Sequence, residues 1–192
     1  MGDPSGIGPE IAVRCACKKE LQELAEISIF GCPSIIEEAA RRFAGSAKFS
    51  VVPTGSMLFS ELAPGKLSAQ CGREAHEAIR EATLEVIARR FDALVTCPVN
   101  KAAVNAAGIP FTGHTEMVAE LCGTKSYAMM QSAGSLRVVF ATTHISLAEV
   151  PDAGTEERIL EVAELLRDAI VSEGIAKPKI ALAALNPHAG EN

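Results

Sequence analysis

The sequence predicts an α/β protein with a mostly parallel, twisted sheet that carries helices on both faces. Strand-like and helix-like stretches alternate along nearly all of the 192 residues. The helical stretches are long enough to act as crossovers between neighbouring parallel strands, which need a connection of about a dozen residues or more. The chain has neither an internal repeat nor a low-complexity tract, as expected of a protein with a hydrophobic core.

Proline positions and apolar spacing locate the helices. Pro9 and Pro33 each suit the first turn of a helix, and Glu10 is favourable near the positive end of the helix dipole. A long central segment repeats apolar residues at spacings of four, three and four, which places them in one stripe: Ala75, Ile79, Ala82 and Val86. Long helices are therefore expected over residues 9–23, 33–43, 68–90 and 155–173.

Short apolar stretches between these helices predict the strands. FDALVT has the length and content of a buried strand, and KIALAAL is expected to be the final strand. YAMMQS and LRVVFATT are expected to form two neighbouring strands. The expected strands cover residues 26–31, 48–53, 91–96, 127–132, 136–143 and 179–185. No internal domain boundary is evident along residues 1–192.

Composition and charge narrow the possible functions. The chain has a net charge of −6 and a sequence pI near 5.3, without a stripe of lysine and arginine, which argues against general nucleic-acid binding. No apolar run approaches the ~20 residues that span a bilayer, and MGDPSGIGPE is neither a signal peptide nor a basic presequence. We therefore expect a cytoplasmic protein with no membrane partner, in which local groups hold any anionic ligand.

The cysteines carry no metal or disulfide signature. The six residues are scattered and form no CxxC pair. This pattern predicts reduced, mostly buried thiols rather than a zinc cluster or a disulfide framework. They are Cys15, Cys17, Cys32, Cys71, Cys97 and Cys122.

The first candidate stretch is GDPSGIGPE, a glycine loop ahead of a helix. Its glycines, Gly2, Gly6 and Gly8, match neither the dinucleotide fingerprint nor the Walker loop. Glycines before a helix N-terminus can let backbone amides approach an anion. The other interpretation is a tight strand-to-helix turn that binds nothing.

The second candidate stretch is TCPVNKAAVNAAGIPFTGHTEMVAELCG. Lys101 follows an expected strand, so its ammonium could lie over a sheet-end crevice. A short helix should begin near His114 or Thr115, and its free amides, the Thr115 hydroxyl and the His114 ring would suit a phosphate or carboxylate. Alternatively, Thr115 only caps the helix and His114 is a partly exposed polar residue.

Two further histidines follow expected strands, in ATTHI and in LNPHAGE. His144 and His188 could enter one crevice and share a metal, because imidazole suits zinc and other first-row divalent ions. Ordinary hydrogen-bonding histidines fit the same positions. The fourth histidine, His76, is expected to be solvated on the polar side of the long central helix.

Four stretches occur together and in order: GDPSGIGPE, CPVNKAAVNAAGIPFTGHTE, VVFATTHISLAEVP and LNPHAGE. In this combination the chain resembles the 4-hydroxythreonine-4-phosphate dehydrogenases of the vitamin B6 pathway over essentially its whole length. The resemblance implies an NAD(P)-dependent homodimer with a fold similar to that of isocitrate and isopropylmalate dehydrogenases. It also implies oxidation of 4-phosphooxy-L-threonine, a small phosphorylated hydroxy-amino acid, to a β-keto acid that loses CO₂.

The resemblance also implies roles for four residues. His114 and Thr115 match substrate-binding residues of the family. His144 and His188 match two ligands of a divalent metal, such as zinc, magnesium or cobalt, at a site shared across the dimer interface. No catalytic residue of the family is matched in this chain. NAD or NADP is the implied cofactor, and the residues that would bind it are not identified from the sequence.

The chain departs from the family at both ends. The family has a strand before GDPSGIGPE and, after NPHAGE, a continuation with a further metal-binding histidine and the nucleotide-binding segments. Residues 1–192 are therefore expected to be the N-terminal and central part of a longer dehydrogenase, truncated at both ends and inactive alone. Two alternatives stay open: a paralogue that oxidises a threonate or erythronate phosphate, and a non-catalytic fragment that retains only ligand or metal binding.

Overall fold

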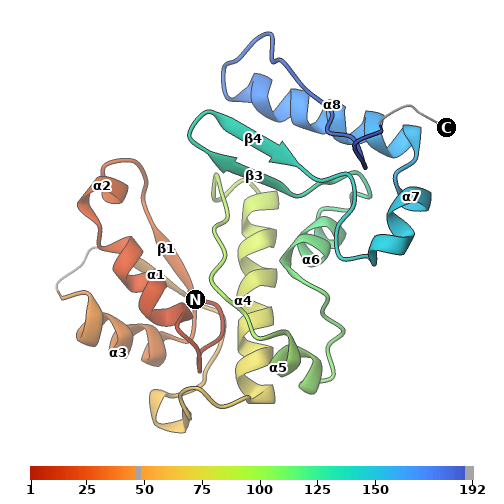
Figure 1. The fold of residues 1–192 in the computed structure, drawn as a ribbon. Coiled ribbons are helices and arrows are strands. Elements are labelled where there is room, and N and C mark those ends of the chain that lie inside the picture. Colours follow the sequence, from red (N-terminus) through yellow and green to blue (C-terminus); the bar gives the residue numbers. More distant parts are fainter. Residues whose placement is uncertain (46–48, 189–192) are drawn as a thin grey trace. The chain divides into compact units, whose positions relative to one another are not determined.

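The computed structural model describes residues 1–45 and 49–188, and the chain divides into two compact units, Met1–Gly123 and Thr124–Asn192 (Figure 1). The first unit holds most of the helices and a parallel strand pair. The second unit holds an antiparallel hairpin and one long helix. The predicted α/β class is therefore confirmed.

The parallel pair of the first unit consists of β1 (Ser28–Gly31) and β2 (Ser50–Pro53). Ile29 pairs with Val51 in the register, and α3 (Pro33–Phe43) connects the two strands as a crossover. This arrangement is the strand–helix–strand unit expected from the alternating pattern. Lys48, which opens the expected second strand, lies outside the described residues.

Helices cover both faces of β1, because successive side chains of a strand point to opposite sides. Ile29 packs in one core cluster with residues of α3 and of α1 (Gly8–Ala16). Its neighbour Phe30 packs in another cluster with Ala78 and Ala82 of α4 (Ala69–Ile87). The strand is thus enclosed between α1 and α3 on one face and α4 on the other.

A third cluster joins α4 to two short helices, α5 (Lys101–Ala106) and α6 (His114–Leu121). Its buried members come from all three helices and the loop between α5 and α6: Ile79, Val104, Phe111 and Met117. The apolar stripe expected on α4 is confirmed by buried Ala75, Ile79 and Ala82. The sequence did not predict α5, whose N-cap Asn100 accepts a hydrogen bond from the Ala103 amide at 3.2 Å.

The helix expected over residues 9–23 forms two separate helices, α1 and α2 (Lys19–Gln22). Lys18 adopts an extended backbone between them. The Gln22 side chain donates a hydrogen bond to the Ala16 carbonyl at 2.8 Å, which satisfies an acceptor at the end of α1. A short 3₁₀ turn, η1 (Phe59–Glu61), precedes α4.

The second unit contains the hairpin of β3 (Met130–Ala133) and β4 (Leu136–Val139). The hairpin confirms that the two apolar stretches are adjacent, and their pairing is antiparallel. After it come η2 (Leu147–Glu149), α7 (Val150–Ala153) and α8 (Glu156–Ser172). The Thr155 hydroxyl caps α8 by accepting from the Arg158 amide at 3.2 Å.

Arg158 attaches the base of this hairpin to the first turn of α8. Its guanidinium donates to the Tyr127 and Ala141 carbonyls, each at 3.0 Å. Tyr127 precedes β3 and Ala141 follows β4. At the far end of α8, Arg137 of β4 forms an ion pair with Glu173 at 2.7 Å.

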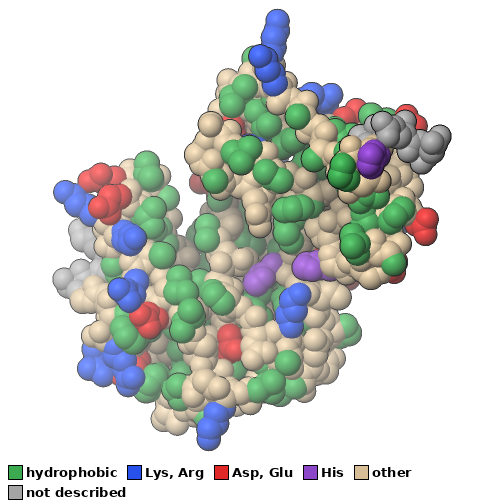
Figure 2. Space-filling view, viewed as in Figure 1, with side chains coloured by type: hydrophobic (Ala, Val, Ile, Leu, Met, Phe, Trp, Pro, Cys, Tyr) green, Lys and Arg blue, Asp and Glu red, His purple; other side chains and the backbone are tan. Residues whose placement is uncertain are grey.

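Two expected strands are wrong as strands of the described chain. Residues 91–96 and 179–185 form no ladder within residues 1–45 and 49–188. Instead of lying in a sheet interior, Val95 is 90% exposed and Leu182 is 74% exposed. Figure 2 shows many apolar side chains on the surface of the face in view. A strand needs a partner backbone to satisfy its amides and carbonyls, and the described chain offers none to these segments.

The prediction that the cysteines are mostly buried is wrong in part. All six thiols are free, but only Cys32 and Cys71 are buried, whereas Cys15 and Cys122 are exposed. Within the part of the chain that the structure describes, no helix is long and apolar enough to cross a membrane.

Candidate functional site

The glycine loop at the start of the chain forms a tight turn that satisfies its own polar groups. The buried Asp3 carboxylate accepts hydrogen bonds from the Ser5 amide at 2.9 Å and from the Ser5 hydroxyl at 3.0 Å. The Asp3 amide donates to the Pro98 carbonyl at 2.9 Å, and the Gly6 amide donates to the Asp3 carbonyl at 3.1 Å. These bonds favour the tight-turn interpretation over anion binding.

Close packing explains the glycines of this loop. Gly2 has a φ of +69°, and a Cβ there would lie 2.5 Å from the Pro98 carbonyl oxygen. At Gly8 a Cβ would lie 2.3 Å from the Met1 carbonyl oxygen. The loop therefore packs against the backbone at Pro98 and helps to fix it. This segment leads through Asn100 into α5.

The more promising site lies at the start of α6. Gly113 is the N-cap residue, and no side chain caps the helix, so the hydroxyl of Thr115 does not serve as the cap. The amides of the first helical turn have no acceptor within the helix and carry the positive end of its dipole. His114 is the first helical residue and Thr115 the second, and both are half-buried.

Opposite charges border Gly113. A Cβ built on Gly113 would lie 3.7 Å from the Lys101 ammonium nitrogen and 2.8 Å from the Glu116 Oε2. Lys101 is the first residue of α5. The loop after α5 therefore brings Gly113 back to the start of that helix. An anion at the start of α6 would be attracted by the Lys101 ammonium. It would compete with the Glu116 carboxylate for that positive charge.

The His114 ring has one satisfied side and one unsatisfied side. Its Nε2 is buried and has no hydrogen-bond partner. Burial lowers the pKa of His114 and the nearby Lys101 charge adds to that shift, while a hydrogen bond to the Cys97 backbone opposes it. The ring is therefore neutral at pH 7, with an unused polar atom that a ligand could satisfy.

His76 differs from the sequence prediction of a solvated residue. It is half-buried, and its ring meets the edge of Phe111 at a centroid distance of 6.4 Å. Burial is the main cause of its lowered pKa. The prediction is wrong because the loop between α5 and α6 covers this side of α4.

His144 and His188 both lie in the second unit, and both are exposed. β4 ends at Val139, so His144 lies beyond the strand rather than at its end, with a φ of +60° in the left-handed region. The His188 amide donates to the Asn186 side chain at 2.8 Å. The residues after His188, including those of the expected LNPHAGE loop, lie outside the described part of the chain.

The described residues do not form a complete metal site. No group of three or more His, Cys, Asp or Glu side chains has a metal-binding arrangement within residues 1–45 and 49–188. Two imidazoles are fewer than the three protein ligands typical of catalytic zinc. The metal-binding roles of His144 and His188 stay predictions.

Comparisons with known proteins point to one family. The family model described as "Pyridoxal phosphate biosynthetic protein PdxA" matches residues 10–192. A relative from Bradyrhizobium diazoefficiens, provisionally named D-threonate 4-phosphate dehydrogenase, is 40% identical over 207 residues, which include 100% of this chain and 60% of the relative. A 4-hydroxythreonine-4-phosphate dehydrogenase from Vibrio vulnificus is 36% identical over 204 residues, with 100% of this chain and 62% of the relative covered.

Solved structures show the same relationship. The 4-hydroxythreonine-4-phosphate dehydrogenase of Burkholderia phymatum superposes with a TM-score of 0.84 at 28% identity, over 99% of this chain and 62% of that chain. The chain therefore has the fold of the corresponding part of these dehydrogenases, and it spans about three fifths of the length of its relatives.

Proposed function

Because the chain belongs to the pyridoxal phosphate biosynthetic protein PdxA family, we propose that it is the substrate-binding part of a dehydrogenase acting on a phosphorylated hydroxy acid. The observation that carries the proposal is the start of α6, where uncapped amides, the Lys101 ammonium and the unpartnered His114 Nε2 come together. The amides and the ammonium supply positive charge and hydrogen-bond donors in a chain with a net charge of −6, and Nε2 supplies an acceptor.

The proposed ligand group is a phosphate or carboxylate oxygen of the substrate. Helix-start amides and an ammonium both favour such an anion. A neutral imidazole donates from one nitrogen and accepts at the other. Because the other ring nitrogen of His114 is engaged by the Cys97 backbone, Nε2 would accept a proton from a substrate hydroxyl. Thr115 adds a hydroxyl one residue further along α6.

When bound, NAD or NADP would supply the acceptor for the hydride that leaves the carbon of the secondary hydroxyl, and the hydroxyl proton would pass to a base. With 4-phosphooxy-L-threonine the resulting β-keto acid then loses CO₂, which leaves an amino-ketone phosphate. A divalent metal would stabilise negative charge on the reacting oxygen, and His144 and His188 are its proposed ligands. The proposed assembly is a homodimer.

Threonate 4-phosphate is the second candidate substrate, because relatives are named for both activities. The two substrates differ at C2, which carries an amino group in one and a hydroxyl group in the other. Both carry the phosphate and carboxylate that the α6 site would bind. Comparing their turnover by a full-length relative and their affinity for this chain would separate the two.

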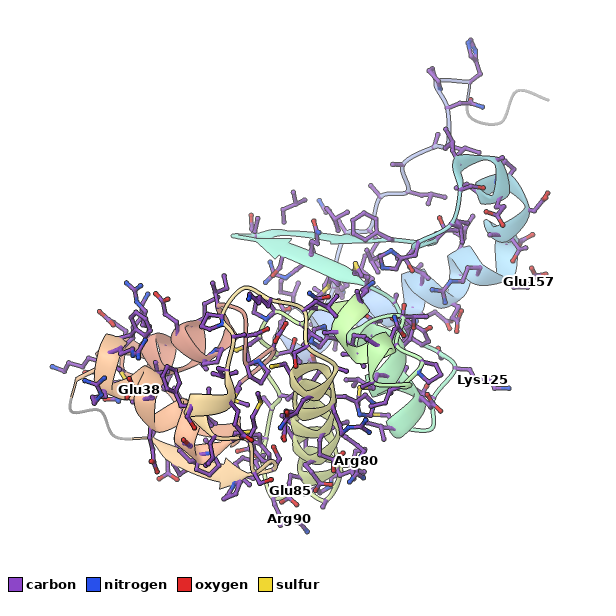
Figure 3. The ribbon with its side chains drawn as sticks, turned by 90° about the horizontal axis from the view of Figure 1, so that it is seen from below. Glu38, Arg80, Glu85, Arg90, Lys125 and Glu157 are labelled. Carbon is purple, nitrogen blue, oxygen red and sulfur yellow. The ribbon has the colours of Figure 1, made fainter. Side chains whose placement is uncertain are left out.

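Calorimetric titration of the chain with inorganic phosphate and with each substrate tests the proposal. We expect Lys101→Met to weaken binding about tenfold, which corresponds to ~1.4 kcal/mol. Glu116→Gln should strengthen binding, because it removes the competing carboxylate. Lys125→Met is the matched control, since Lys125 is exposed in the other unit and extends into solvent (Figure 3). Equal effects of the two lysine variants would contradict the site.

Assays of nicotinamide reduction then distinguish an active enzyme from a fragment that only binds ligand. We expect no turnover by the 192-residue chain alone, because its relatives are longer and the described residues hold no complete metal site. Turnover with either substrate, in a preparation free of full-length enzyme, would overturn this expectation. Binding without turnover would support a fragment that retains only ligand binding.

A further inference from the structure

Asn105 of α5 holds both backbone groups of a residue in the following loop. Its Oδ1 accepts a hydrogen bond from the Phe111 amide at 2.9 Å, and its Nδ2 donates to the Phe111 carbonyl at 3.3 Å. The Asn105 side chain thus satisfies both backbone polar groups of Phe111, as a neighbouring strand would do. The loop of residues 107–113 is fixed at its midpoint while α5 and α6 fix its ends.

Phe111 in turn supports the His114 ring. The Phe111 side chain is only 6% exposed and belongs to the cluster of α4, α5 and α6. Its ring meets His114 at a centroid distance of 6.0 Å and an interplanar angle of 80°, which is the edge-to-face geometry that aromatic rings prefer. The Phe111 ring also meets His76 at 6.4 Å and 83°. Phe111 therefore contacts two imidazoles.

The His114 ring depends on this support because a hydrogen bond holds it on one side only. Nε2 has no partner, so the interaction with the Cys97 backbone must involve the other ring nitrogen. A single hydrogen bond leaves rotation of the ring plane weakly restrained. The edge contact with Phe111 supplies the missing restraint.

We propose that Asn105 is a positioning residue: by clamping the Phe111 backbone it sets the orientation of the His114 ring at the start of α6. Only the consequence for substrate binding rests on the proposed function above. The orientation of the ring is a property of the chain without a ligand. Asn105 itself is exposed, and its side chain acts on His114 through the two hydrogen bonds to Phe111.

The test compares Asn105→Ala with Asn100→Ala. Both residues are exposed asparagines, Asn105 within α5 and Asn100 at its N-cap, and each accepts a backbone amide hydrogen bond. Asn100 bonds the amide of Ala103 in α5 rather than Phe111. Imidazole NMR spectra are readable because the chain has 4 histidines. In Asn105→Ala we expect weaker nuclear Overhauser contacts between His114 and Phe111, and a His114 pKa closer to its ordinary value. In Asn100→Ala both should be unchanged.

A second variant covers the case in which Asn105→Ala fails to fold. Phe111→Leu keeps an apolar side chain and the backbone clamp but removes the ring edge, so it should raise the His114 pKa in the same direction. Thermal unfolding of each variant checks that it is folded. The proposal is overturned if both Asn105→Ala and Phe111→Leu fold with an unchanged His114 signal, or if Asn100→Ala moves that signal equally.

Phosphate titration separates this proposal from the proposed function. If the wild-type chain binds inorganic phosphate, Asn105→Ala should bind it several-fold more weakly while Asn100→Ala binds as wild type. If the wild-type chain binds no phosphate or substrate, the proposed function fails, yet the changes of the His114 signal still support the positioning role of Asn105.

Discussion

Gly72 of α4 lies directly against the backbone of Ala103 in α5. A Cβ at position 72 would lie 2.2 Å from both the carbonyl carbon and the carbonyl oxygen of Ala103. Backbone atoms cannot rotate away as a flexible side chain can. The contact brings the two helices that support the candidate site as close together as their backbones allow.

Gly72→Ala should therefore destabilise the chain, although alanine favours a helix over glycine by ~1 kcal/mol. Overpacking against backbone costs about 1–3 kcal/mol, and α5 must move to accommodate the methyl group. We expect a lower midpoint in thermal unfolding. Gly6→Ala is the control, because a Cβ there would lie no closer than 3.5 Å to another atom. A Gly72→Ala variant as stable as wild type would show that α5 moves at little energetic cost, which would contradict the prediction.

Two half-buried histidines should make stability fall in mild acid. Burial lowers the folded-state pKa of both His76 and His114 from the ordinary value of 6.5. Between the folded and unfolded pKa values, the unfolded chain binds more protons, so stability rises with pH in that window. We expect stability to fall as pH drops below about 6.5, measured by urea unfolding. Replacing both histidines by asparagine should flatten this part of the profile.

A second fall in stability is expected at lower pH, and it has a different origin. Glu38 of α3 (Figure 3) accepts hydrogen bonds from the side chains of Arg41 and Arg42, and these bonds lower its pKa to about 2. Its contribution is present above the ordinary value of 4.5 and is lost as pH falls toward the folded value. Because the Arg41 and Arg42 side chains are exposed, added salt should weaken this contribution, whereas the histidine window should persist. Equal salt sensitivity of both windows would contradict the assignment.

Thiol labelling should follow the burial of the cysteines. Cys32 is fully buried and donates to Glu74 at 3.3 Å, and burial together with this bond raises its pKa to about 12. Since the thiolate is the reactive form, Cys32 should resist iodoacetamide in the folded chain. Exposed Cys15 and Cys122 should react first, as read by peptide mass spectrometry. Full labelling of Cys32 before unfolding would refute the burial described here.

Arg158→Lys should loosen the hairpin of the second unit. A lysine ammonium cannot reproduce the fork that reaches both the Tyr127 and Ala141 carbonyls, so at least one acceptor loses its bond. A lost hydrogen bond of this kind costs about 1–3 kcal/mol. Arg167→Lys is the matched control, because Arg167 bonds only its exposed neighbour Asp168 on the same helix. Proteolysis near residues 127–141 should increase in the first variant alone.

Elements with strong local signals were predictable from the sequence. α3 and α8 begin and end close to the expected residues because a proline, a capping threonine and apolar spacing act within a few residues of one another. The segments around Val95 and Leu182 were not predictable, since a strand also requires a partner at a distance in the sequence. The break at Lys18 depends on a single extended residue, which no periodicity reveals.

The candidate site was predictable from the sequence only for residues whose positions follow from a local helix pattern. The start of α6 at His114 follows from apolar spacing, and the sequence identifies Lys101 as a cation near the same site. The roles of Asn105 and Phe111 were missed, because they arise from contacts that the folded loop creates. The burial of His76 was missed for the same reason: an isolated helix pattern places it toward solvent.

The glycine at position 113 has a thermodynamic consequence. Serine or aspartate at this position would bring its own oxygen to the first amides of α6, and glycine gives up a few tenths of a kcal/mol by lacking one. An arriving anion would supply that oxygen from outside the chain. Ordering of the first turn and ligand affinity are then one linked equilibrium, and each must strengthen the other by the same factor.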